Sequence, residues 1–225
     1  MFETSEISIP TGKIIVLPDY FVDPRPSQQH FFAGLIERNE KLSPIFVVQH
    51  GDEYGLVDGI NRLEAQKLLG RETIRAVIVD VIQVRPEEVI FKPDIYPRFD
   101  VDQERVALFA DLMRHGQPFP LIFTTRTEEG YTLLDGKYRL DAMKQAGLTK
   151  INIAVLPRPK DMLFAVVRFN NFSRSGVLFT KEDIREVVLQ GLENGLSIET
   201  IAGKLEYPVS WVQSLVQHEG GERDG

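Results

Sequence analysis

The sequence contains no cysteine, which excludes disulfides, thiolate catalysis and cysteine-ligated zinc or iron–sulfur centres. Its four histidines are scattered along the chain, and none stands at a metal-ligand spacing from another. No apolar run approaches the roughly 18 residues that a membrane-spanning helix needs. The first residues also form neither a basic start nor an apolar signal segment. We therefore expect a cytoplasmic protein that does not bind membranes.

Basic residues are fewer than acidic ones, 26 against 33, which gives a formal net charge of −7. Because phosphate binding needs clustered lysine and arginine, this balance argues against a protein that coats nucleic acid by charge alone. Local basic clusters can still bind phosphate. The length of 225 residues fits two or three small domains, and the 43% hydrophobic content supports real cores.

The most informative feature is an internal repeat between residues 56–65 and 133–142. Its turn residues Asp58, Gly59 and Arg62 recur 77 positions later as Asp135, Gly136 and Arg139. A duplicated structural unit explains this spacing most simply. An Asp-Gly turn that leads into a helix with an arginine in its first turn is typical of a phosphate site, because helix N–H groups, the helix dipole and a guanidinium all favour anions. The alternative is an aspartate cap beside a surface arginine.

Apolar periodicity and turn residues predict the order β-α-β-β-α-β in both copies. In the first copy we expect strands over 13–22, 44–48, 56–57 and 76–81, and helices over 27–41 and 59–69. The second copy repeats these elements between residues 89 and 156, and only helices follow. The sequence thus predicts an α+β protein, with tandem units at 1–84 and 85–160 and an all-α segment at 161–225.

Three short motifs after residue 95 resemble those of the ParB/sulfiredoxin superfamily. Residues 96–100 (YPRFD) resemble its Pro-Arg-x-x-Phe-Asp motif, and 136–139 (GKYR) stand in the place of its Gly-Glu-Arg-Arg box. Residues 170–174 (NNFSR) stand where Glu-Asn-x-x-Arg follows. The resemblance covers residues 89–217. In that family the three motifs surround cytidine triphosphate, with arginine-bearing turns on the phosphates and the Glu-Asn pair near Mg²⁺.

The resemblance implies a nucleoside triphosphate ligand, with CTP first, and Mg²⁺ placed by Asn171. The nucleotide-binding residues that it implies are Arg98, Asp135, Gly136, Lys137, Arg139, Asn171 and Arg174. The corresponding candidates for a second site in the first unit are Arg25, Asp58, Gly59 and Arg62. Asn170, Tyr138 and Lys137 replace a family glutamate, arginine and glutamate, so nucleotide binding is better supported than metal-dependent hydrolysis.

The superfamily also includes sulfiredoxins and free-serine kinases. Sulfiredoxin chemistry needs a cysteine and is excluded. The serine kinases carry Asp-Gly-His-His-Arg at the repeated turn, so a phosphotransferase acting on a small hydroxyl compound is an alternative function. Asp58 or Asp135 would then be the general base. A third alternative is a non-catalytic scaffold that binds a protein partner or a second copy of itself.

The C-terminal segment resembles a helix-turn-helix, because the apolar residues between 201 and 215 have the spacing that packs two helices across a tight turn. The residues that would contact DNA bases are Ser210, Gln213, Ser214 and Gln217. Residues 210–217 contain no lysine or arginine, and residues 176–225 carry four basic residues against nine acidic ones. A packing module that binds a partner protein is therefore the alternative to a DNA-binding module.

Overall fold

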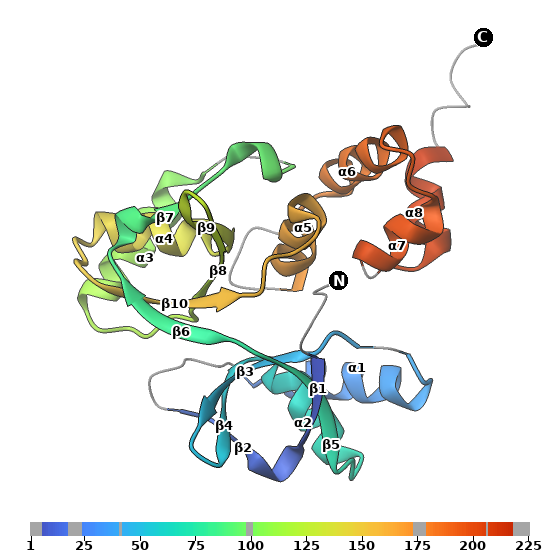
Figure 1. The fold of residues 1–225 in the computed structure, drawn as a ribbon, viewed down its shortest axis with the longest axis horizontal. Coiled ribbons are helices and arrows are strands. Elements are labelled where there is room, and N and C mark those ends of the chain that lie inside the picture. The colour runs from blue at the N-terminus through green and yellow to red at the C-terminus, as the bar shows by residue number, and fades with distance from the viewer. Residues whose placement is uncertain are drawn as a thin grey trace.

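The computed structural model describes residues 6–17, 24–40, 42–97, 101–172, 179–205 and 207–217, apart from the side chains of 171 and 172. These residues form two five-stranded sheets and eight α-helices, which confirms the α+β class (Figure 1). Among them, no helix is both long and apolar enough to span a bilayer.

The first sheet is built from residues 6–78. Its elements are β1 (Glu6–Pro10), β2 (Ile14–Ile15), α1 (Pro26–Glu37), β3 (Ile45–His50), β4 (Glu53–Asp58), α2 (Ile60–Leu68) and β5 (Thr73–Ile78), with a 3-10 turn at Thr11–Lys13. The strand order is β1-β5-β3-β4-β2. β3 runs parallel to β5 and antiparallel to β4, so the sheet is mixed.

The second sheet repeats this arrangement. Its elements are β6 (Asp80–Val84), β7 (Val89–Ile90), α3 (Gln103–Arg114), β8 (Ile122–Thr127), β9 (Gly130–Asp135), α4 (Lys137–Gln145) and β10 (Ile151–Leu156), with 3-10 turns at Pro86–Glu88 and Pro93–Ile95. The strand order β6-β10-β8-β9-β7 matches the first sheet position for position. β8 is parallel to β10 and antiparallel to β9, as in the first unit.

Each sheet has one more strand than the sequence predicted. β1 and β6 are the additional strands, and each pairs antiparallel with the last strand of its own unit. The single strand predicted over 76–81 is wrong: β5 ends at Ile78, and β6 starts at Asp80 in the other sheet. Between them, the Val79 amide donates to the Val47 carbonyl, so the chain passes from one sheet to the next within two residues.

Four helices complete the described chain: α5 (Met162–Phe172), α6 (Lys181–Glu193), α7 (Ile198–Leu205) and α8 (Val209–Gln217). Thr180 caps α6 in a capping box with Asp183, as its sequence predicts. The last helix starts at Val209, so Ser210 lies within its first turn. The helices share a core of buried apolar side chains, separate from the cores beneath the sheets.

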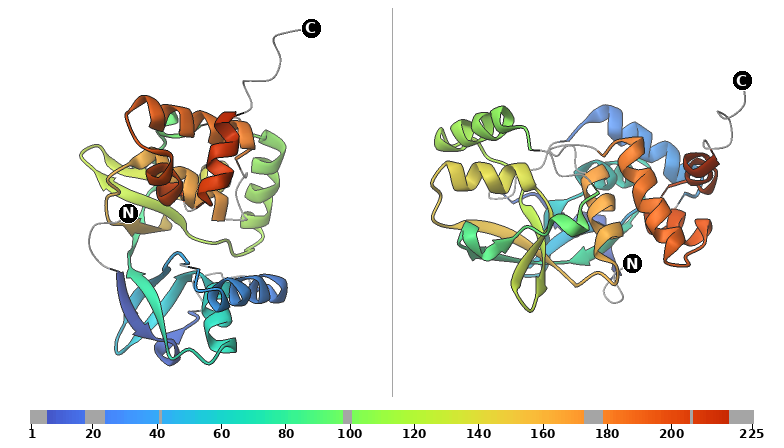
Figure 2. Two further views of the ribbon diagram at one scale, coloured as in Figure 1. Left: turned by 90° about the vertical axis from the view of Figure 1, so that its right-hand side faces the viewer. Right: turned by 90° about the horizontal axis from the view of Figure 1, so that it is seen from above.

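The two units pack against each other through equivalent faces of their sheets. Along β3, Ile45 and Val47 point into the first unit's own core, whereas Phe46 between them points to the second unit. The shared core pairs positions 77 residues apart: Phe46 and Phe123, Val57 and Leu134, Val77 and Ala154, and Val79 and Leu156. Figure 2 shows the two units stacked, with the C-terminal helices beside the second. Burial on both faces explains why the central strands read as continuous apolar runs.

Candidate functional site

The turn between β9 and α4 requires a glycine. Gly136 has φ of 105° and ψ of 30°, a left-handed conformation that side chains rarely adopt. A Cβ atom built on Gly136 would lie 2.6 Å from Cγ2 of Ile122. The glycine therefore lets β9 turn sharply into α4 while the turn lies directly against β8.

Arg139 lies beneath this turn and points into the protein. Its Nη1 donates to the carbonyls of Pro120 at 2.9 Å and Leu121 at 2.8 Å, and its Nη2 donates to Oδ2 of Asp135 at 2.7 Å. The side chains of Asp135 and Arg139 are each only 1% exposed. In this structure the arginine holds the turn against the start of β8, and phosphate contact would require it to leave these partners.

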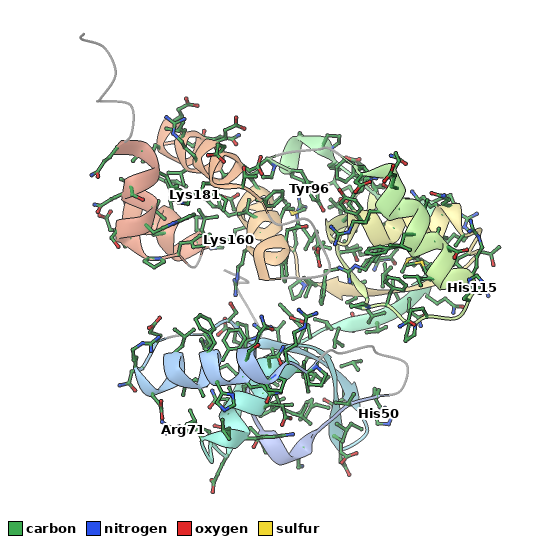
Figure 3. All side chains as sticks on the ribbon, turned by 180° about the vertical axis from the view of Figure 1, so that it is seen from behind. His50, Arg71, Tyr96, His115, Lys160 and Lys181 are labelled. Atoms are coloured by element: carbon green, nitrogen blue, oxygen red, sulfur yellow. The ribbon has the colours of Figure 1, made fainter. Side chains whose placement is uncertain are left out.

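Two further residues enclose the Asp135–Arg139 pair. Nδ2 of Asn170 donates to the carbonyls of Leu134 at 3.0 Å and Val166 at 2.8 Å, which fastens α5 to the end of β9. Desolvation raises the pKa of Tyr96 well above its usual value, and the nearby Asp135 carboxylate raises it further. Figure 3 labels Tyr96 near α5.

The buried pair also retains unused hydrogen-bonding capacity. Oδ1 of Asp135 and Nε of Arg139 are buried without a hydrogen-bond partner within the described part of the chain. Sequence reasoning missed the roles of Tyr96 and Asn170, because the contacts that give them these roles are made between residues far apart in the chain.

The first turn of α4 combines the backbone donors of a helix start with a cation. Gly136 at the N-cap has no side chain, so α4 begins without a side-chain cap and its first backbone N–H groups point toward the helix start. Lys137 follows directly; its Nζ lies 4.9 Å from the ring centroid of Phe91 and forms an ion pair with Asp141. Backbone donors and a cation at one helix start favour an anion.

The first unit has the same bracing but a more open turn. Gly59 has φ of 105°, and Nη1 of Arg62 donates to the carbonyls of Ser43 at 3.1 Å and Pro44 at 2.9 Å. Nη2 of Arg62 donates to Oδ2 of Asp58 at 2.8 Å. The side chain of Asp58 is 51% exposed, in contrast to the 1% of Asp135. The two turns thus have the same internal geometry and different surroundings.

The helix beside each turn begins at an equivalent position. In the first unit the Arg25 amide donates to Oδ1 of Asn61 at 2.7 Å, and in the second the Asp102 amide donates to the Tyr138 hydroxyl at 3.2 Å. The Asp102 carboxylate caps α3, whereas Arg25 makes no side-chain cap on α1. Arg25 therefore lies next to the 58–62 turn, and α1 starts at Pro26, one residue before the predicted start of this helix at residue 27.

The remaining predicted residues of the nucleotide site lie outside the part of the chain that the structure describes. They are Arg98, Arg174 and the side chain of Asn171. Within the described ranges, no group of three histidine, aspartate or glutamate side chains is placed to hold a metal ion.

Comparison with known proteins gives one family match and several similar structures. The sequence pattern of the ParB N-terminal domain family matches residues 31–89, from within α1 to the start of β7. The second sheet repeats the strand order of the first sheet, which lies within this matched region for most of its length. Residues 31–89 are therefore similar to the ParB N-terminal domain. A comparison with curated proteins found no match.

Similar solved structures include C-terminally truncated ParB from Caulobacter crescentus with CTP-γ-S, sulfiredoxin from Arabidopsis thaliana and a free serine kinase with AMP. Their identities to this chain are 18%, 19% and 14%, with TM-scores of 0.37, 0.34 and 0.30. The alignments cover 60%, 40% and 83% of this chain, and 76%, 98% and 73% of those chains. The family match lies mostly on the first unit, where sequence analysis found the fewest motifs of this superfamily.

The C-terminal helices place the four predicted DNA-contacting residues on the outer side of α8. Ser210, Ser214 and Gln217 are exposed and Gln213 is partly exposed. Val212 and Leu215 of the same helix point into the helical core. This arrangement leaves one polar face of α8 available to a partner.

Proposed function

We propose that this protein binds a nucleoside triphosphate, with CTP first, at the start of α4 and uses it to regulate contact with DNA or a protein partner. The observation that carries the proposal is the braced turn itself. Gly136 leaves the first N–H groups of α4 without an N-cap side chain, and Lys137 adds a cation there. A phosphate group fits that chemistry because it takes several N–H donors and one or more cations at once.

Differences between the two units favour the second as the nucleotide site. Lys137 is Ile60 in the first unit, so the cation at the helix start belongs to the second unit alone. Arg98 and Arg174 would supply further phosphate contacts by family resemblance. Asn171 offers a single neutral oxygen to a metal, so Mg²⁺ would be held mainly by the phosphates and water.

A regulatory role follows from the position of α5 beside the turn. A nucleotide that contacts both the α4 start and residues 171–174 would tie the second unit to the helices that follow. The difference in nucleotide affinity between the tied and untied states supplies the free energy for such a switch. The outer face of α8 is the proposed contact with DNA, in a helix-turn-helix formed by α7 and α8, or with a protein partner.

A phosphotransferase is the second candidate, and the exposure of one carboxylate favours it. Asp135 is buried against Arg139, so it cannot accept a proton from a hydroxyl substrate without opening of the turn. Asp58 is half exposed and occupies the equivalent position. If the protein transfers phosphate to a small hydroxyl compound, Asp58 is the better placed general base.

Calorimetry with CTP, ATP, ADP and GTP, each with and without Mg²⁺, tests the nucleotide proposal. We expect saturable binding of one nucleotide, weakened about tenfold in Lys137→Gln, since a hydrogen bond to a charged group contributes about 1.5 kcal/mol or more. Lys144→Gln, at the exposed far end of the same helix, is the matched control and should bind as the wild type does. Equal affinity of both variants would place the nucleotide elsewhere, and no binding would favour the scaffold.

Duplex binding measured across a salt series tests the DNA proposal. Replacement of Gln213 and Ser214 by alanine should reduce binding if the outer face of α8 contacts bases. Absence of binding by the wild type at low salt, with and without nucleotide, would leave a protein partner as the target of this face.

A further inference from the structure

Helix α5 joins the two sheets through one aromatic side chain. The ring of Phe169 lies 5.5 Å from that of Phe46 in the first unit and 5.8 Å from that of Phe123 in the second, and it is stacked on Phe123. Phe46 and Phe123 are equivalent residues whose rings are 5.5 Å apart. The contact between the two units therefore continues directly onto α5.

The next residue of α5 connects this aromatic cluster to the candidate site. Asn170 donates to the carbonyl of Leu134, the residue before Asp135, and it is buried. Leu134 itself belongs to the core between the two units. A continuous set of contacts thus leads from Phe46 in the first unit, through Phe169 and Asn170, to the turn of the second unit.

The opposite face of α5 belongs to the C-terminal helices. Phe164 and Val167 lie in the helical core with α6, α7 and α8. Nζ of Lys204 on α7 lies 3.4 Å from Oδ2 of Asp161 and 5.3 Å from the ring centroid of Phe164. A displacement of α5 would therefore alter both the Asp135 turn and the anchoring of the helices that follow.

We propose that the first unit controls the second unit's turn by holding α5 in place. With Phe46 packed on Phe169, α5 covers the Asp135–Arg139 pair. When this contact is weakened, Asn170 withdraws from the Leu134 carbonyl and the turn becomes exposed, as the equivalent Asp58 turn is now. The proposal gives the first unit a regulatory role that does not require it to bind a ligand.

The proposed link has a clear direction because α5 has no equivalent in the first unit. After β5 the chain enters β6 of the other sheet, whereas after β10 it forms α5. Only the second turn is covered, so only that turn can respond to a displaced α5. The effect on ligand affinity rests on the proposed nucleotide function, but the structural coupling does not.

Hydrogen exchange of the full-length protein tests the coupling without any ligand. Phe46→Leu should speed amide exchange about tenfold in residues 163–172 and 134–140, which corresponds to about 1.4 kcal/mol of lost local stability. Val47→Ala is the matched control, because this neighbour in β3 is equally buried but points into the first unit's own core. It should speed exchange in the first unit only.

A second variant approaches the same contact from α5. Phe169→Leu should speed amide exchange in the same two segments as Phe46→Leu. The loss of local stability in the double variant should be smaller than the sum of the two single losses, because both substitutions remove the same contact. The proposal would be overturned if Phe46→Leu speeds exchange only within the first unit. It would also be overturned if Phe46→Leu and Val47→Ala affect residues 134–140 equally. If Phe46→Leu fails to fold, Phe169→Leu alone decides.

Calorimetry with CTP separates this proposal from the nucleotide proposal. If the wild type binds CTP, Phe46→Leu should bind it about tenfold more weakly, because the proposed ligand contacts both the start of α4 and the end of α5. The affinity of Val47→Ala should stay within about twofold of the wild type. Unchanged affinity in Phe46→Leu would refute control of the ligand site by the first unit. If the wild type binds no nucleotide, the proposed function fails, and the exchange experiment still decides whether the first unit holds α5.

Discussion

The repeated arginine provides a comparison of the same substitution in two environments. Arg139→Met and Arg62→Met each remove one guanidinium that donates to two backbone carbonyls and one aspartate. The internal contacts of the two residues are alike. What differs is the carboxylate left behind, since Asp135 is 1% exposed and Asp58 is 51% exposed.

The expected cost follows from that difference. Removing one partner of a buried ion pair leaves an uncompensated charge and costs about 3–5 kcal/mol. Asp58 stays hydrated when Arg62 is removed, so the loss there is mainly of hydrogen bonds to carbonyls, about 1–3 kcal/mol. We therefore expect Arg139→Met to reduce the free energy of unfolding by roughly 2 kcal/mol more than Arg62→Met.

Urea unfolding followed by far-ultraviolet circular dichroism measures this difference. With a slope of about 2 kcal/mol per molar urea, the midpoint of Arg139→Met should lie roughly 1 M below that of Arg62→Met. Adding Asp135→Asn to Arg139→Met should restore part of the loss, because the uncompensated charge is then gone. Equal midpoints, or no recovery in the double variant, would refute the assignment of Asp135–Arg139 as a buried pair.

Three further predictions concern single positions. Gly136→Ala should lower the free energy of unfolding by more than about 2 kcal/mol, whereas Gly116→Ala should lower it by about 1 kcal/mol. Both glycines have a positive φ, but only a Cβ atom at position 136 would meet a neighbouring side chain. The urea midpoints of the two variants measure this difference. Because the pKa of Tyr96 is raised in the folded state, its contribution to stability is present below about pH 10 and is lost as the pH rises toward the folded-state pKa. The urea midpoint should therefore fall less steeply above pH 10 in Tyr96→Phe than in the wild type. Equal slopes in the two proteins would contradict this prediction. Thr180→Ala should lower the stability of the helical module by about 1 kcal/mol, measured by fluorescence of Trp211, and an unchanged unfolding curve would show that the capping box contributes little.

Much of the architecture could be predicted from the sequence because the duplicated segment has a fixed spacing. Equivalent turns at 58–62 and 135–139 predicted two sheets of the same design, and the structure has them. The extra strands could not be predicted as easily. β1 covers only residues 6–10 with alternating exposure, and β6 is separated from β5 by the single residue Val79. Short strands at a boundary lack a long enough pattern to identify them.

The inward direction of the arginines depends on tertiary structure. A sequence places Arg139 in the first helical turn but does not place the carbonyls of residues 120 and 121, which accept its hydrogen bonds. The same holds for the exposure of the paired aspartates. Asp58 and Asp135 stand in the same motif, but Asp135 lies near Tyr96, and α5 is fastened beside it by the hydrogen bond from Asn170 to the Leu134 carbonyl, 36 residues apart in the chain.

The duplication therefore generates two turns with different surroundings from one motif. In each copy an aspartate, a glycine and an arginine form the same internal bracing, so the motif alone predicts a stable turn at a helix start. What a ligand encounters depends on the segment that follows each unit. After the first unit the chain continues straight into β6, and the turn stays open; after the second it forms α5, which adds a second wall. Only the second turn therefore has a following helix beside it, and only the first has an exposed aspartate.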